Sequence, residues 1–109
     1  MEPTITLRLL NGPSRGEIAR HATTALAVRA GLPPLAADRA GGAVAAAVAA
    51  ANADEVTLTA SLEPAAAEVV LTAAGAWAGG HADALAHLDA AVTADRVCFR
   101  FARTPLRRV

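Results

Sequence analysis

The stretch Glu55-Val-Thr-Leu-Thr-Ala-Ser-Leu-Glu63 decides the fold of this chain. Apolar and polar residues alternate along it, so Val56, Leu58, Ala60 and Leu62 share one face and hydroxyl residues occupy the other. This period of two is typical of a β-strand that buries one face against a core. The stretch therefore predicts a sheet with one face buried against the core and the other exposed to solvent.

A second strand is predicted at Glu68–Ala73, where Val69 and Leu71 would face inward. Only the short connection Pro64–Ala67 separates the two strands. Because a connection this short joins neighbouring antiparallel strands, we expect a β-hairpin.

Two further strands show the same alternation, one at Thr4–Leu10 and one at Arg96–Arg103. Their inward-facing apolar residues are Ile5, Leu7, Leu9, Val97, Phe99 and Phe101. The last strand is therefore expected to turn both phenylalanines toward the core.

The first helix is expected between these strands, with its start at Ser14 and Glu17. A serine followed three residues later by a glutamate is the spacing of a capping box, in which each side chain bonds the other's backbone N–H. Apolar residues then recur at roughly helical spacing up to Val28, and Gly31 suits the C-terminal cap.

A second helix is predicted from about Pro34 to Ala51, with Asn52 in the left-handed position that ends it. A third helix is predicted from the helical spacing of His81, Leu85, Leu88 and Val92.

The predicted order is β-α-α-β-β-α-β, which indicates an α/β (α+β) two-layer sandwich. Its sheet would be mixed, mostly antiparallel and four-stranded, with the helices on one face. We expect one domain over residues 1–103, followed by a basic C-terminal tail over residues 104–109.

Composition restricts the partners. The 109 residues are 54% hydrophobic and 18% charged, and 10 basic residues balance 10 acidic ones. A neutral chain of this kind indicates neither a nucleic-acid nor a membrane partner. The single cysteine, Cys98, excludes an internal disulfide, and the N-terminal sequence lacks the pattern of a signal peptide, so we expect a cytoplasmic protein.

Several stretches resemble a known family. Asp38–Asn52 is similar to its nucleotide-site helix, and Val69–Gly75 to a strand that usually ends in Asp-x-Gly. Arg29–Arg39, Asp54–Glu63 and the Ala84–Val92 segment also read like its members. The chain thus resembles the GHKL (histidine kinase-like) ATPase superfamily, and within it the short anti-sigma factor serine kinase-like proteins of bacterial transcription regulation.

The resemblance implies three polar roles. In such a family a Glu activates the attacking group, an Asn holds Mg²⁺ and an Asp accepts from the adenine amino group. The matching positions here are Ala46, Ala50 and Ala73, and a methyl group performs none of these roles. Gly75 is retained, whereas Trp77 stands where a second Gly is usual, and its bulk would crowd adenine.

Two further points bear on the same site. Only about five residues, Ala76–Gly80, precede the predicted third helix, so the family's lid is expected to be deleted. Shifting the register to bring Asn52 to the Asn position leaves Val48 at the Glu position, which is still not catalytic.

Other polar or glycine-rich features receive structural interpretations. Gly41-Gly42 and Gly79-Gly80 match no phosphate-loop spacing, and loop flexibility or close helix packing explains them better. Cys98 has no local signature of a nucleophile, so packing is expected.

The histidines do not predict a metal site. His81 and His87 are six residues apart, and Asp83 with His87 is the only pair at the i, i+4 spacing of helical ligands. Because two ligands do not make a site, no metal is expected.

The sequence therefore predicts a non-catalytic regulatory module that binds a protein: a sigma factor, an anti-sigma antagonist or a related ATPase-like protein. The chain is a possible dimer, and no cofactor is expected. Arginines near the first helix and the C-terminus are the candidate contacts, namely Arg15, Arg20, Arg100, Arg103, Arg107 and Arg108. Two alternatives remain open: an active ATP- and Mg²⁺-dependent serine/threonine kinase whose site is misaligned, and a small-molecule binder that uses the vacated pocket.

Overall fold

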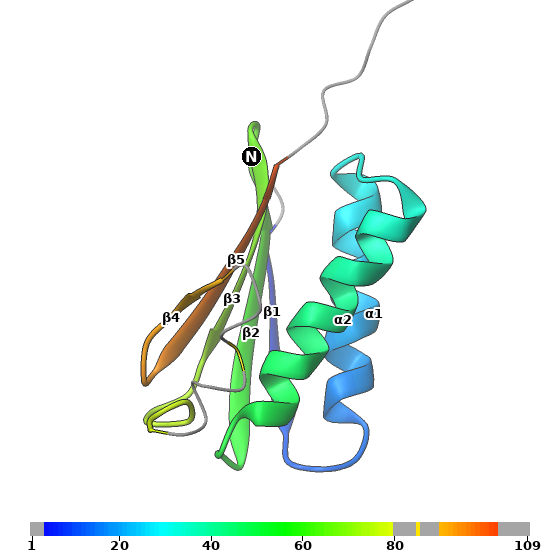
Figure 1. The fold of residues 1–109 in the computed structure, drawn as a ribbon. Helices are drawn as coiled ribbons and strands as arrows, with labels where there is room; N and C mark the ends of the chain where they lie inside the picture. The colour runs from blue at the N-terminus through cyan, green and yellow to red at the C-terminus, as the bar shows by residue number, and fades with distance from the viewer. Residues whose placement is uncertain (1–3, 80–84, 86–89, 103–109) are drawn as a thin grey trace, which may run out of the picture.

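The computed structural model describes residues 4–79, 85 and 90–102. In this part of the chain, two helices lie on one face of a five-stranded sheet, which makes an α+β domain (Figure 1). The elements in order are β1 (Thr4–Leu10), α1 (Arg15–Arg29), α2 (Pro34–Ala50), β2 (Glu55–Leu62), β3 (Ala66–Thr72), β4 (Ala91–Val92) and β5 (Arg96–Ala102).

The strands are ordered β1-β2-β3-β5-β4, and every neighbouring pair is antiparallel. One row of the register runs Leu7, Leu58, Leu71 and Val97 across four strands. The last three are fully buried and Leu7 is half-buried. The inward-facing alternation expected from the sequence is confirmed, and it fixes which side of the sheet the helices cover.

The expectation of four strands in a mixed sheet is wrong. The short strand β4 pairs with β5, with Val92 opposite Val97, and no described pair is parallel. β4 lies where the third helix was expected to end. Val92 was assigned to that helix from its spacing, but an apolar residue at this position suits a strand equally well. Most of that expected helix falls outside the described residues; Leu85, which is described, is buried in a turn.

The expected capping box at the start of α1 does not form. Ser14 has helical backbone angles (φ −90°, ψ −10°), and its side chain makes no capping hydrogen bond. A capping serine needs an extended backbone to reach the N–H three residues on. Glu17 instead lies 3.4 Å from the ring of His21, one turn along the helix.

The C-terminal end of α1 follows the sequence prediction. Gly31 has a φ of +90°, and the Leu32 N–H donates to the Ala27 carbonyl at 3.1 Å. These two features form a Schellman cap, for which glycine is the preferred residue.

The prediction for Asn52 is wrong. Helix α2 ends at Ala50, the next residue, Ala51, is extended (φ −69°, ψ 126°), and no described non-glycine residue has a positive φ. The chain passes directly from the helix toward β2. The Asn52 N–H donates to the Ala76 carbonyl at 2.9 Å, which ties this junction to the loop after β3.

Gly41 lies where the two helices pack closely together. A Cβ atom there would lie 2.9 Å from the Arg20 carbonyl oxygen, and nearer still to the Thr24 hydroxyl. Gly42 has open space beside it. Close helix packing, one of the two interpretations of the glycine pair, is thus confirmed for Gly41.

The core lies between the sheet and the helix pair. Its helix side is largely alanine and valine, while the large side chains come from the strands and the loop after β3. The largest fully buried side chains include Trp77, Phe99, Leu9, Leu58 and Leu71. Neither described helix combines the length and hydropathy that crossing a bilayer requires.

Candidate functional site

The five positions matched to the nucleotide site differ in their exposure to solvent. Ala46 is exposed on α2, and Gly75 is exposed in the turn after β3. Trp77 is fully buried, and Ala50 and Ala73 pack half-buried against the same core cluster. Ala50, Ala73 and Trp77 thus belong to one core cluster or its border, whereas Ala46 and Gly75 face solvent.

Trp77 fills the space between α2 and the loop after β3. Its indole Nε1–H donates to the Ala47 carbonyl oxygen at 2.9 Å, and its backbone N–H donates to the Ala94 carbonyl at 3.0 Å. A buried indole needs such a partner, because leaving its N–H unpaired would cost free energy. The hydrogen-bonded indole of Trp77 therefore fills the interior between α2 and this loop.

Asp95 holds the loop that carries Gly75. Its carboxylate Oδ1 accepts from the Gly75 N–H at 2.6 Å, and its backbone carbonyl accepts from the Ala73 N–H at 3.0 Å. Gly75 has a φ of +67°, which favours glycine there for backbone reasons alone. Asp95 carries no sequence signal that points to Gly75, because the two meet only through the pairing of β3 with β5.

The described residues offer little catalytic chemistry at this place. The three matched alanines present methyl groups, which neither bind a cation nor move a proton. No group of three or more His, Cys, Asp or Glu side chains is placed to hold a metal ion within residues 4–79, 85 and 90–102. His81, Asp83 and His87 lie outside the described residues.

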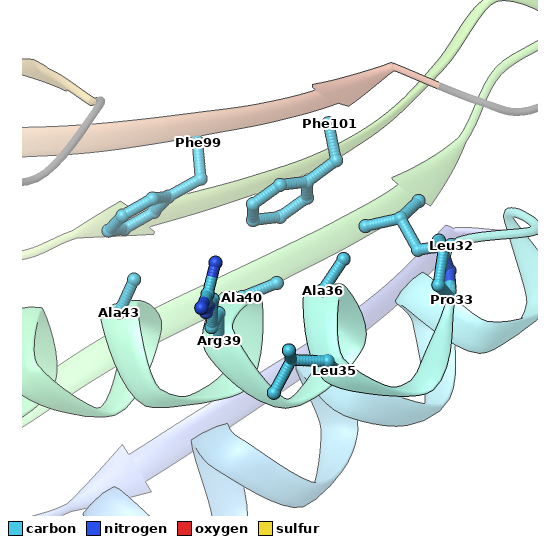
Figure 2. A pocket seen from close by; sticks show the side chains of 9 residues that line it. All are labelled: Leu32, Pro33, Leu35, Ala36, Arg39, Ala40, Ala43, Phe99 and Phe101. Atoms are coloured by element: carbon cyan, nitrogen blue, oxygen red, sulfur yellow. The ribbon is translucent and has the colours of Figure 1, made fainter.

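A half-open groove lies elsewhere, between the N-terminal half of α2 and β5. Its volume is about 500 Å³. Phe99 and Phe101 point from β5 toward the helix, and alanines point back at them (Figure 2). The lining consists of Leu32, Pro33, Leu35, Ala36, Arg39, Ala40, Ala43, Phe99 and Phe101.

The groove exists because its two walls differ in side-chain size. Ala36, Ala40 and Ala43 on α2 are too short to fill the space that the rings leave. Phe99 and Phe101 lie nearly parallel, with ring centroids 6.3 Å apart and planes 13° apart. Phe99 is 1% exposed, whereas Phe101 is half-buried, so the outer ring forms an apolar wall that a ligand can reach.

Arg39 is the only charged residue in this lining. Its exposed side chain makes no ion pair within the described part of the chain, whereas the neighbouring Asp38 accepts from Arg20 of α1 at 3.3 Å. Leu35, 64% exposed, stands at the same rim. This combination suits an apolar group that carries a negative charge at one end.

The arginines expected to contact a partner have different surroundings. Arg15 is nearly buried and donates to the carbonyls of Ala51 and Ala53 at 2.9 and 2.7 Å, so it holds the end of α2. Arg100 is exposed and lies 3.3 Å from Glu63 and 3.4 Å from Glu68. Arg103, Arg107 and Arg108 lie outside the described residues.

Cys98 is half-buried on the sheet face that the helices do not cover, opposite Val70. Burial raises the pKa of its thiol, and the carboxylate of Glu68 raises it further, against the opposing pull of Arg96 and Arg100. A thiol with a raised pKa carries little thiolate at neutral pH and is a poor nucleophile.

Comparison with models of protein families finds no match to this chain, and comparison with curated proteins finds no similar sequence. The resemblance to GHKL ATPases therefore stays a prediction that depends on the stretches quoted above.

Proposed function

We propose that this domain is a non-catalytic regulatory module that captures a protein partner. The observation that carries the proposal is the groove between α2 and β5, which has apolar walls and one charged side chain, Arg39. An exposed apolar hollow of this kind favours an apolar occupant, because removing both apolar surfaces from water lowers the free energy. Arg39 at the rim gives the occupant an orientation.

The surroundings of Trp77 support the non-catalytic part of the proposal. The family resemblance implies a nucleotide between α2 and the loop after β3, where this chain carries a buried indole bonded to Ala47. A ligand there would have to displace the indole and break its hydrogen bond. Partner capture through the groove requires no such displacement.

The partner is expected to be a protein segment with apolar side chains and a nearby carboxylate. On the resemblance to anti-sigma proteins, the best candidates are a sigma factor, an anti-sigma antagonist or a related ATPase-like protein, which would place this module in bacterial cytoplasmic regulation. Such a module retains a holding surface without a phosphorylation step.

Nucleotide titration tests the non-catalytic part. With ATP and Mg²⁺ at millimolar concentration, isothermal titration calorimetry and Trp77 fluorescence are both expected to stay flat. Trp77 is a direct reporter because it lies between α2 and the loop after β3. A saturable, Mg²⁺-dependent signal would contradict the proposal and favour the alternative of an active serine/threonine kinase.

Partner capture tests the groove. Leu35→Glu places a carboxylate at the groove rim and should reduce capture of a sigma factor or antagonist at least about tenfold, because it buries a charge against an apolar surface. Val28→Glu is the matched control, since Val28 is a similarly exposed apolar residue, at 56%, that lies outside the groove lining. Equal loss in both variants, or in neither, would contradict a role for the groove.

Small-molecule binding is the remaining alternative. That alternative places the ligand in the vacated nucleotide pocket, so saturable binding of a small apolar ligand that changes Trp77 fluorescence would favour it. The melting temperatures of Leu35→Glu and Val28→Glu should match that of the wild type, because both positions are exposed.

A further inference from the structure

Strand β1 forms one edge of the sheet, and its peptide groups alternate between β2 and the open side. The ladder register pairs Leu9 with Val56, and the Asn11 N–H continues it by donating to the Asp54 carbonyl at 2.7 Å. In an antiparallel pair, hydrogen-bonded positions alternate with unbonded ones. The backbone N–H and C=O of Thr6 and Arg8 therefore point away from β2.

The two edges of the sheet differ in how they are protected. Proteins usually protect an edge with a proline, a bulge, a lysine or a very short strand. β4, at one edge, has only two residues. β1 has seven residues, contains no proline or lysine, and pairs with β2 in an unbroken register. Within the described residues, the open side of β1 is thus an unprotected template for another strand.

The charge on β1 does not protect the edge either. Arg8 donates from Nε and Nη2 to the two carboxylate oxygens of Glu55, at 2.8 and 3.3 Å. This bidentate pair neutralises the only charged side chain of the strand. Ile5, on the helix-covered side, leaves 49% of its surface exposed.

The same edge carries a small apolar hollow. Its volume is about 140 Å³, and it lies between the N-terminal half of β1 and the C-terminal half of α1. The lining consists of Ile5, Ala22, Ala25, Leu26, Arg29, Ala60 and Leu62. A strand seated on β1 would cover the exposed part of Ile5 and border this hollow.

We propose that the occupant of this edge is β1 of a second copy of the chain, paired antiparallel about a two-fold axis at Leu7. In this register Thr6 lies opposite Arg8 of the second copy, and Ile5 lies opposite its Leu9. The outward peptide groups of Thr6 and Arg8 then face each other across the axis. The two sheets become one, with both helix pairs on the same face.

Self-complementarity makes a second copy the best occupant. The register overlaps all seven residues of β1, and it places no arginine opposite another. The helix-covered face receives Ile5, Leu7 and Leu9 from each copy, so apolar side chains meet apolar ones. A two-fold contact uses the same patch twice, and the sequence of β1 meets that condition in this register. This dimer surface lies apart from the proposed groove, and neither proposal depends on the other.

Disulfide cross-linking tests the register in a Cys98→Ala background. Leu7→Cys places two thiols on the axis in an unbonded pair, where Cα atoms lie about 4.5 Å apart, within disulfide range. Ile5→Cys is the control, because its two copies lie four residues apart along the strands, about 13 Å. Leu7→Cys should form a disulfide dimer under mild oxidation, and Ile5→Cys should not. Equal cross-linking of both variants would overturn the proposed register.

Charge placement at Thr6 tests the pairing without cross-linking. Thr6→Arg places an arginine opposite Arg8 of the second copy at two symmetric points, whereas Thr6→Glu places a carboxylate there. Sedimentation should give a dimer dissociation constant at least about tenfold higher for Thr6→Arg than for Thr6→Glu. The melting temperature of each dilute monomer measures any effect within one chain. Wild-type protein that sediments as a monomer at all concentrations, or equal constants for the two variants, would overturn the proposal.

Discussion

Trp77 shows how one side chain sets what the interior can hold. Its indole supplies volume and a donor at the same place, and the Ala47 carbonyl accepts from that donor inside a helix. Helix carbonyls have a second lone pair, so this bond forms without breaking the helix. Ala50 and Ala73, whose side chains are small, pack against the core cluster that contains Trp77.

The raised pKa of Cys98 leads to a prediction at this scale. Iodoacetamide should alkylate Cys98 more slowly than free glutathione at neutral pH, and the rate should rise only as the pH passes the ordinary thiol range of about 8.5. Glu68→Gln removes a nearby negative charge, so it should lower the pKa and speed alkylation at a fixed pH.

The control for the cysteine experiment is Glu17→Gln, at an exposed position on α1. It should leave the alkylation rate unchanged. A Glu68→Gln variant that reacts no faster than the wild type would mean that the carboxylate does not act on the thiol.

Individual residues also differ in how well their roles follow from sequence. Gly31 was predicted correctly because a left-handed helix end strongly favours glycine. Ser14 and Asn52 have side chains that suit helix caps, but the backbone does not form either cap. Ser14 has helical backbone angles, and the chain is already extended at Ala51, before Asn52. Arg15 gives no local signal, since its acceptors, Ala51 and Ala53, lie far away in the sequence.

Among the elements, β2 and α2 were the easiest to predict and β4 the hardest. The alternation from Glu55 onward extends over the whole strand, and the alanine-rich run before it has a strong intrinsic helix preference. β4 has only two residues, too few to show a period, and its strand conformation comes from pairing with β5. Local pattern identifies long elements and misses those that tertiary pairing creates.

The packing of α1 on α2 leads to a prediction at the element scale. Gly41→Ala should destabilise the domain by about 1–3 kcal/mol, because the new methyl group overlaps the Arg20 carbonyl and the Thr24 hydroxyl. Gly42→Ala, one residue away in open space, should stabilise it by up to about 1 kcal/mol through helix propensity. Urea unfolding measures both variants, and a shift of the same sign in the two would contradict this packing.

For the whole molecule, the core depends on few large side chains. Phe99→Ala should lower the free energy of unfolding by about 3–5 kcal/mol, since the ring is 1% exposed. Phe101→Ala should cost less, about 1–2 kcal/mol, because that ring is only half-buried at the groove. Denaturant unfolding of the two variants checks this order. A loss below about 1 kcal/mol for Phe99→Ala would contradict its place in the core.

The candidate site was less predictable than the fold. The inward direction of Phe99 and Phe101 follows from alternation, but the groove beside them requires α2 to lie against β5 at Ala36, Ala40 and Ala43. Nothing in a run of alanines tells which of them will face a ring. The matched positions Ala46, Ala50 and Ala73 were identified from the resemblance, and their different exposure depends on how α2 packs against the sheet.

The pairing of β1 with β2 has a consequence for synthesis on the ribosome. The helix pair α1–α2 is complete once residue 50 has emerged, yet Leu9 of β1 cannot meet Val56 until β2 has followed. During that interval residues 4–10, with their apolar Ile5, Leu7 and Leu9, have no partner strand, and unpaired segments of this kind associate readily with other chains. The time that residues 51–62 take to emerge from the ribosome therefore determines how long each nascent chain presents this segment to its neighbours.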